Sequence, residues 1–343
     1  MNSPIFEDKT FIVAELSANH GFDINVAKKT ILAARDSGAD AIKIQTYTPD
    51  TLTIDCRNEH FMVSGGTLWD GQSLYELYKT AFTPWEWTGE LKEYSESIGL
   101  IFFSTPFDRT SVDFLEDHNV PLYKIASFEI TDLELIEYVA SKGKPVLIST
   151  GIATPEEMED AVNTCRNIGN NNIFLLKCTS QYPSMVEDAN LNTMVDIQKR
   201  FNVAVGLSDH SEGYIVPVTA VAMGAKIVEK HFVLNRDIGG PDASFSMLPD
   251  DFKEMVEKIR QVEKALGKVS YTLTDKIQAS RLFARSLFIV QDMHEGDIFT
   301  RDNIRSIRPG KGLAPKYLSS FLGKRIKSDV KRGTPVSWSM LDQ

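Results

Sequence analysis

Two histidines stand beside charged residues at the ends of two successive apolar runs. VGLSDHS (205–211) carries Asp209 and His210, and IVEKHF (227–232) carries Glu229 and His231. A histidine in a strand is often only a structural residue, and that alternative stays open. Two imidazoles with oxygen ligands nearby favour a site for a divalent ion (Mn²⁺, Mg²⁺, Co²⁺ or Zn²⁺) that polarises a carbonyl. We expect Asp209 or Glu229 to complete the ion's shell or to orient a ring N–H.

Lysines inside apolar runs are the second chemical signal. Lys43 and Lys124 interrupt such runs, and a barrel interior has no use for them unless an anion pairs with them. Schiff-base chemistry at one lysine is the alternative. Hydroxyl groups that would complete a site for a phosphate and a carboxylate belong to Thr105, Ser127, Ser149 and Ser208.

The elements that must position these residues recur along the chain. Short apolar runs alternate with segments of helical spacing, several of which end at a glycine. Eight such units over about 265 residues predict a (β/α)₈ TIM barrel. A doubly wound sheet is the alternative, but no GxGxxG follows the first run. The eight expected strands are 11–18, 41–47, 100–107, 122–127, 145–150, 172–180, 202–210 and 226–232.

Barrel geometry explains why polar residues end these runs. Active sites of such barrels lie at the C-terminal ends of the strands, so we expect these side chains to converge on one mouth. They are Glu15, Lys43, Gln45, Ser104, Thr105, Lys124, Ser127, Ser149, Lys177, Ser208, Asp209, His210, Glu229 and His231. An insertion of about 25 residues after the second run, longer than most βα loops, is expected to be a substrate lid; a mobile decoration is the alternative.

Composition limits the class of protein. The chain has 343 residues, 42% hydrophobic and 24% charged, as in soluble globular proteins. It contains no run of about 18 apolar residues and no export signal, so we expect no membrane partner. Three cysteines without a CxxC pair favour a reducing compartment, with the cytoplasm as the expected location.

Charge is distributed unevenly along the chain. Residues 281–343 hold 12 Lys/Arg against 6 Asp/Glu, whereas the whole chain has a net charge of −10. A nucleic-acid-binding tail is one explanation. The segment is not of low complexity, however, and its runs SLFIV and GTPVSW read as strands. We therefore expect a small folded basic domain, with no nucleic acid as partner.

Eight motifs in order carry a resemblance to a known family. AELSANHG, IKIQTY, FFSTPF, YKIAS, ISTGIAT, KCTSQYP, GLSDHSEG and EKHF resemble the sialic acid synthases. The C-terminal stretch, with FARSLF and SIRPGKGL, resembles their antifreeze-like (SAF) domain. The resemblance implies a catalytic TIM barrel at 1–266, a linker at 267–284 and a SAF domain at 285–343.

Within the family, QTYTPDTLT and LWDGQSLYELYKTAFTPWEW resemble the pseudaminic acid synthases, whereas LSANH and IASFE depart from the neuraminate type. The implied reaction condenses phosphoenolpyruvate with 2,4-diacetamido-2,4,6-trideoxy-L-altrose. N-acetylneuraminate or legionaminate synthesis is the alternative within the family. Outside it, the alternatives are another metal-dependent aldolase-type enzyme or hydrolase on this fold, and a carbohydrate-binding module.

The resemblance also implies roles for single residues. His210 and His231 would bind a divalent ion (Mn²⁺, Mg²⁺ or Co²⁺), and Glu15 would position water or move its proton; a salt bridge to a lysine is the alternative for Glu15. Arg308 would reach the sugar of a partner subunit, which implies a domain-swapped homodimer. Phosphoenolpyruvate would contact Lys43, Thr105, Lys124, Ser127, Ser149 and Ser208. The sugar would contact Gln45, Glu129, Tyr182 and Asp242.

The methyl and acetamido groups of the expected sugar call for an apolar surround. Phe128 stands at the end of the fourth run, where the neuraminate type has glycine. An aromatic-rich stretch from Trp69 to Trp87 follows the insertion. The alternative for that stretch is ordinary packing of a helix face, with Trp85 and Trp87 as its cover.

Overall fold

The computed structural model describes residues 9–64, 66 and 68–341. The chain divides into two compact units, Met1–Gly267 and Lys268–Gln343. Each unit is described by itself below.

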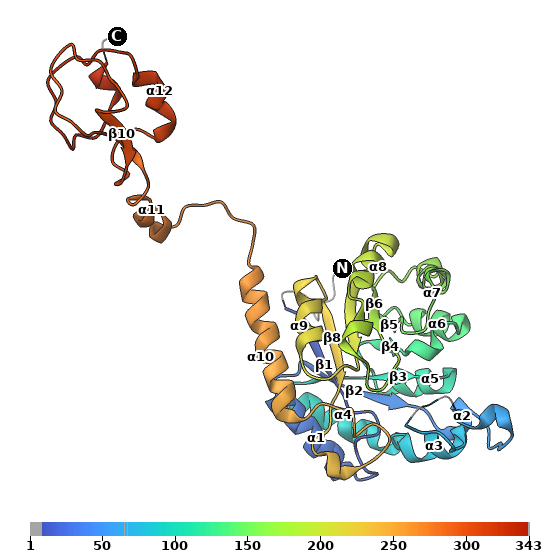
Figure 1. Cartoon of the computed structure of the whole chain (residues 1–343). Coiled ribbons are helices and arrows are strands. Elements are labelled where there is room, and N and C mark those ends of the chain that lie inside the picture. The colour runs from blue at the N-terminus through green and yellow to red at the C-terminus, as the bar shows by residue number, and fades with distance from the viewer. Residues whose placement is uncertain (1–8, 65, 67, 342–343) are drawn as a thin grey trace. The chain divides into compact units, whose positions relative to one another are not determined.

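The first unit is a closed barrel of eight parallel strands in sequential order, with helices around it (Figure 1). Each strand pairs with the next, and β8 closes on β1 with Glu15 opposite His231. This confirms the expected TIM barrel and rules out the doubly wound sheet. The strands are β1 (Phe11–Glu15), β2 (Ala41–Thr46), β3 (Ile101–Pro106), β4 (Tyr123–Ile125), β5 (Val146–Ser149), β6 (Ile173–Cys178), β7 (Ala204–Asp209) and β8 (Ile227–His231).

Local sequence signals set the ends of the helices. Asp23 caps α1 by accepting a hydrogen bond from Asn25 N–H, and Thr154 forms a capping box with Glu157 at the start of α7. The helices around the barrel are α1 (Ile24–Asp36), α4 (Thr88–Ser97), α5 (Arg109–Asp117), α6 (Leu133–Ala140), α7 (Pro155–Asn167), α8 (Asn192–Phe201), α9 (Ile215–Ala222) and α10 (Pro249–Leu266).

Alternation along the strands creates two apolar layers. Side chains such as Val13, Phe103 and Leu176 fill the lumen. Strand residues one position out of phase with the lumen side chains, such as Leu207 and Val228, pack with the helices in a larger outer layer. Because successive residues of a strand face opposite sides, each strand end presents one side chain to the lumen and the next to the helices.

The insertion after β2 has regular structure of its own. It contains α2 (Pro49–Leu52) and the 3₁₀ turn η2 (Glu59–Phe61), and a bridge between Met62 and Ser73 leads into α3 (Leu74–Ala81). Gly65 and Thr67 of the insertion lie outside the described residues. Further 3₁₀ turns are η3 (Trp85–Trp87), η4 (Ser127–Glu129), η5 (Val186–Ala189) and η6 (Arg236–Ile238).

The second unit has its own small core around one antiparallel pair, β9 (Ser286–Ile289) and β10 (Ile304–Ile307). It also contains α11 (Asp275–Arg281), α12 (Leu318–Phe321), η7 (Pro315–Tyr317) and η8 (Trp338–Met340). The strand at SLFIV is confirmed. The strand expected at GTPVSW is wrong: Pro335 forms an isolated bridge with Phe288, and Gly333, with a φ of 91°, turns the chain just before it.

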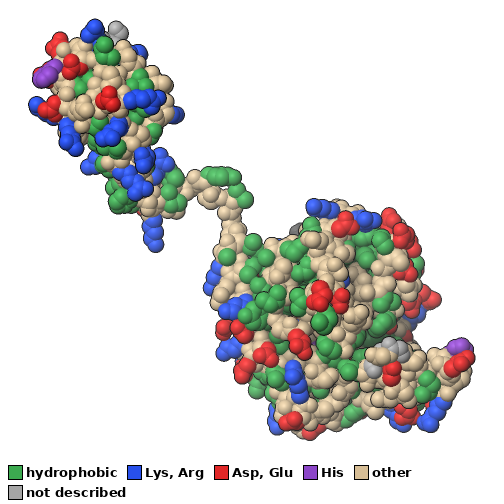
Figure 2. Space-filling view, in the orientation of Figure 1, with side chains coloured by type: hydrophobic (Ala, Val, Ile, Leu, Met, Phe, Trp, Pro, Cys, Tyr) green, Lys and Arg blue, Asp and Glu red, His purple; other side chains and the backbone are tan. Residues whose placement is uncertain are grey.

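The segment expected to be a linker, 267–284, contains α11 and exposes apolar side chains. Val269 is 90% and Tyr271 93% exposed. Lys and Arg side chains gather on the second unit, to which most of this segment belongs (Figure 2). Across the described part of the chain, no helix combines the length and the hydrophobicity that a bilayer crossing requires.

Candidate active site

Strand alternation decides which of the expected mouth residues face the lumen. Three do not, because each is one residue out of phase with the inward side chains. Ser104 bonds to Thr46, Lys177 Nζ donates to the Cys178 carbonyl, and Asp209 pairs with Lys230. The expectation that these three converge on the mouth is therefore wrong, and so is a place for Asp209 in a metal shell.

The lumen holds two lysines and two carboxylates in one network. Lys43 Nζ lies 2.6 Å from Glu15 Oε2 and 3.5 Å from Glu229 Oε1. Lys124 Nζ lies 3.8 Å from the same Glu229 oxygen. All four side chains are nearly inaccessible to solvent, and the opposite charges that face each other offset part of the cost of burying them.

This network shifts the pKa of each member. Burial raises the pKa of Glu15, with Lys43 opposing it and Glu229 adding to it. For Glu229 burial acts in the same direction, but Lys124 and Lys43 outweigh it and lower its pKa. Burial lowers the pKa of Lys124, whereas at Lys43 Glu15 and Glu229 overcome burial and raise the pKa. Of the two carboxyl groups, Glu229 therefore keeps its negative charge more readily than Glu15.

Hydroxyl groups surround the lysines. Lys43 Nζ donates to Thr105 Oγ1 at 3.1 Å, and Ser208 Oγ donates to Glu229 at 3.3 Å. Ser127 Oγ, in η4, accepts from Gly151 N–H. Ser149 Oγ is buried and has no hydrogen-bond partner among the residues described. A buried hydroxyl without a partner is costly, so it is a ready donor for a bound anion.

The two histidines meet at the same mouth. Their ring centroids lie 5.3 Å apart, and the ring of Tyr182 lies 4.2 Å from that of His210. His210 Nδ1 lies 2.9 Å from the Thr179 carbonyl; an N–H there donates to that oxygen and leaves Nε2 with a lone pair. His231 Nδ1 is buried, finds no hydrogen-bond partner in the described part of the chain, and lies 3.9 Å from Asp242 Oδ2.

The residues present fit a divalent ion. Burial, His210 and nearby lysines hold the pKa of His231 well below its usual value, which keeps this imidazole neutral. Burial opposes the charged form of His210 too, but Cys178 and the Thr179 carbonyl outweigh it and raise its pKa. Each ring can offer one nitrogen lone pair to an ion: Nδ1 of His231, which is buried without a partner among the described residues, and Nε2 of His210 once that ring has lost its extra proton. No cluster of three or more His, Cys, Asp or Glu suited to a metal exists within residues 9–64, 66 and 68–341.

The expected sugar contacts divide between the two units. Gln45 Nε2 donates to Glu15 (3.1 Å) and Ser17 (3.0 Å), and Asp242 accepts from Ser17 Oγ. In η4, Glu129 lies two residues beyond Ser127; its Oε2 is buried without a hydrogen-bond partner within the described ranges, and burial raises its pKa to about 7. Arg308 is exposed and follows β10 in the second unit.

Sequence reasoning missed two residues of this site. Ser17 links Asp242 and Gln45, and its φ of 45° is unusual for a residue other than glycine. Cys178 lies on β6 in phase with the inward Leu176, and its Sγ lies 3.9 Å from His210 Nδ1. Burial raises its pKa, but His210 and other neighbours lower it to about 7. Alternation from Leu176 would have found Cys178; nothing in the sequence marks Ser17.

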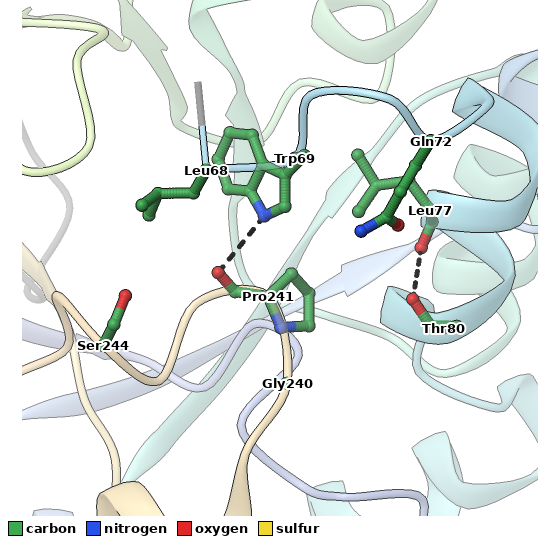
Figure 3. Close-up of a pocket in the computed structure, with 8 residues that line it drawn as sticks. All are labelled: Leu68, Trp69, Gln72, Leu77, Thr80, Gly240, Pro241 and Ser244. Carbon is green, nitrogen blue, oxygen red and sulfur yellow. Dashed lines mark hydrogen bonds between the residues drawn. The ribbon is translucent and has the colours of Figure 1, made fainter. Parts of the chain in front are cut away.

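A cavity of about 510 Å³ lies between the insertion and the loop that follows β8 (Figure 3). Trp69 Nε1 donates to the Pro241 carbonyl at 3.3 Å, and its ring lies 5.8 Å from that of Tyr182. The insertion is thus tied to the mouth through Trp69.

Trp85 and Trp87 instead pack on Phe114 and His20, so packing accounts for that part of the aromatic stretch. Phe128, in η4, is 60% exposed. The cavity is lined by Leu68, Trp69, Gln72, Leu77, Thr80, Gly240, Pro241 and Ser244.

Comparison with known proteins shows which family the chain belongs to. The NeuB family model matches residues 30–271, and the SAF domain model matches 284–342. The pseudaminic acid synthases of Helicobacter pylori and Campylobacter jejuni are 47% and 46% identical over 327 residues, covering 95% of this chain and 96% and 95% of theirs. The crystal structure of N-acetylneuraminic acid (sialic acid) synthetase from Leptospira borgpetersenii, in complex with citrate, superposes with a TM-score of 0.70 at 32% identity, over 79% of this chain and 90% of that one. The chain belongs to the NeuB family, with a SAF domain at its C-terminal end.

Proposed function

We propose that this enzyme is a transferase that condenses phosphoenolpyruvate with 2,4-diacetamido-2,4,6-trideoxy-L-altrose to give pseudaminic acid and phosphate. The observation that carries the chemistry is the pair of buried lysines facing two histidines across one barrel mouth. The names of the relatives that are 46–47% identical support the choice of sugar.

Phosphoenolpyruvate would occupy the lysine side of the mouth. Its phosphate and carboxylate match Lys43 and Lys124 together with the hydroxyls around them. Ser149 Oγ, which has no partner among the residues described, would donate to one of these anionic oxygens. Thr105, Ser127 and Ser208 would complete the cradle.

His210 and His231 would hold a divalent ion (Mn²⁺, Mg²⁺ or Co²⁺), which supplies Lewis-acid polarisation of a carbonyl. Thr179 fixes the ring of His210 through Nδ1. Tyr182 packs on that ring and would shield this side of the mouth from water.

In the proposed reaction, C3 of phosphoenolpyruvate forms a bond to the aldehyde carbon of the open-chain sugar, and the aldehyde oxygen takes up a proton. Water adds to C2 and loses a proton, and the tetrahedral intermediate releases phosphate by cleavage of its C2–O bond. Glu15 is placed to take that proton, because burial raises its pKa toward that of a general base. The ion pair between Glu15 and Lys43 is the alternative, purely structural role of this residue. The proposed catalytic role uses the same carboxylate.

The sugar would lie against Gln45, Glu129, Tyr182 and Asp242, with Arg308 supplied by a partner subunit. This arrangement requires the domain-swapped homodimer. The exposed Val269 and Tyr271 support it, because side chains so apolar are expected to be covered by another surface. We also propose that the enzyme works in the cytoplasm, as its cysteine usage predicts.

The test is a phosphate-release assay with purified protein, phosphoenolpyruvate and Mn²⁺. Release with the diacetamido altrose, together with a product of the mass of pseudaminic acid, is the expected result. Equal catalytic efficiency with N-acetylmannosamine or the legionaminate precursor would reject the proposed sugar but keep the chemistry. Sugar cleavage or hydrolysis without phosphoenolpyruvate would point to the aldolase or hydrolase alternative, and borohydride trapping of a lysine adduct to Schiff-base chemistry.

A further inference from the structure

A buried ion pair connects the strand ends that carry the two histidines. Asp209 and Lys230 are directly opposite in the register of β7 and β8, and each immediately precedes a histidine. Lys230 Nζ lies 2.5 Å from Asp209 Oδ2, and both side chains are only 4% exposed. The pair faces the helices, in the layer where Leu207 and Val228 form the preceding register pair.

The same groups hold the backbone on both sides of His210. Lys230 Nζ donates to the Ser211 carbonyl at 2.5 Å. Asp209 Oδ1 accepts from Ser211 N–H at 3.1 Å and from Ser211 Oγ at 2.8 Å. The residue before His210 and the residue after it are therefore tied to β8, one position from His231.

Stability alone does not account for charges in this layer. Taking two charges out of water costs several kcal/mol per ion, and apolar replacements of buried ion pairs are often neutral or stabilising. Two apolar residues would serve the outer layer equally well, as they do one register pair earlier. What they would not provide is a directional connection between the two strand ends.

We propose that Asp209, Lys230 and Ser211, here called the clasp, are positioning residues that set the His210–His231 geometry for a divalent ion. The inference rests on the proposed metal site. His210 is held by the clasp and by Thr179. The His231 ring has no hydrogen bond from Nδ1 within the described residues; it packs on Phe245, and its position along the strand is set by the backbone that Lys230 anchors.

The test uses the full chain with both charges removed, Asp209→Leu with Lys230→Met, so that neither is left buried and unpaired. Mn²⁺ binding is measured from the electron paramagnetic resonance signal of free Mn²⁺, and the unfolding midpoint is recorded alongside. We expect the Mn²⁺ dissociation constant to rise about ten-fold or more, as when groups that orient metal ligands are lost. Metal-free phosphoenolpyruvate binding should change much less than Mn²⁺ binding, since of its proposed contacts only Ser208 lies on β7 or β8.

Val228→Ala is the matched control. It removes buried methyl groups from the same layer and lowers stability without touching the clasp, so Mn²⁺ affinity should be unchanged. Clasp removal with Mn²⁺ affinity within two-fold of wild type would overturn the inference, as would equal weakening by Val228→Ala. If the double variant fails to fold, Ser211→Ala decides in its place: unchanged Mn²⁺ affinity overturns the inference, and weaker binding at an unaltered unfolding midpoint supports it.

Failure of the metal site itself would look different. Wild-type protein that binds no Mn²⁺, or a His210→Ala/His231→Ala variant that binds it as tightly as wild type, would reject the proposed metal site. The clasp inference fails alone only when wild type binds Mn²⁺ through the two histidines and the clasp variant does so equally well.

Discussion

Glu129→Gln is expected to stabilise the protein in a strongly pH-dependent manner. Glu129 Oε2 is buried and has no hydrogen-bond partner within the described residues. Burial raises the pKa of this carboxyl to about 7, with Lys124 opposing and Asp132 adding to the shift. The folded protein therefore holds a proton on Glu129 at pH values where the unfolded chain has released it.

The magnitude follows from the two pKa values. The ordinary value is 4.5 and the folded value about 7, and each unit corresponds to about 1.36 kcal/mol. As the pH rises from 4.5 to 7, folded Glu129 binds more protons than unfolded Glu129, so stability falls by up to about 3 kcal/mol. A glutamine pays no such penalty. The gain in unfolding free energy of Glu129→Gln over wild type should be smallest near pH 4.5, grow through pH 6 and level off above pH 7.

Urea unfolding of the full chain at several pH values between about 5 and 8 measures this. Glu137→Gln, the same change at an exposed position of α6, is the control and should show no such trend. Because Glu129 is a proposed sugar contact, the glutamine variant should also have a raised KM for the sugar, so stability and function should move in opposite directions.

Two results would refute this reasoning. A stability difference between Glu129→Gln and wild type that is the same at every pH would mean that Glu129 ionises as it does in water. An equal trend for Glu137→Gln would assign the pH dependence to the overall charge of the protein.

Three further predictions concern other parts of the molecule. His210→Ala and His231→Ala should each lower phosphate release by at least about 10³-fold with little change in the unfolding midpoint; turnover that survives chelation in the wild type would contradict the metal requirement. An Arg308→Ala chain mixed with a His231→Ala chain should regain activity, because one site of each mixed dimer has both groups intact; verified heterodimers without activity would place Arg308 in its own chain's site. Gly206→Ala should lower the unfolding free energy by about 2 kcal/mol or more, since the added Cβ would lie 2.7 Å from the Ile227 carbonyl oxygen. An unchanged unfolding midpoint would show that β8 moves to make room for the methyl group.

The sequence predicted the barrel, and most of the side chains that meet at its mouth, because the end of each strand can be recognised in the sequence. Each apolar run stops where polar residues begin, and barrel geometry brings those ends together. The three residues that were wrongly expected at the mouth share one cause. Ser104, Lys177 and Asp209 also stand at strand ends, but one residue out of phase, so they face the helices or the loops. Counting alternation from a known lumen residue separates the two sets.

Other features were beyond sequence reasoning for physical reasons. The Ser17 bonds depend on a backbone at φ 45°, which no residue type marks there. GTPVSW has the composition of a strand, but Gly333 adopts a φ of 91° and the pairing with β9 is limited to the bridge at Pro335. A domain with so few residues in regular strands is held by isolated bridges, and these leave no periodic pattern in the sequence.

Opposite charges in the lumen help the two buried lysines to keep their protons. A buried lysine without a partner tends to lose its proton. Glu229 lies within 4 Å of both ammonium groups, and its own lowered pKa keeps it ionised, so it serves as an internal counterion. An incoming phosphate and carboxylate would compete with Glu229 and Glu15 for the same donors. The carboxylate that gives way more easily is Glu15, whose pKa is already raised, and the proposed step in which Glu15 takes a proton from water draws on the same tendency to bind a proton.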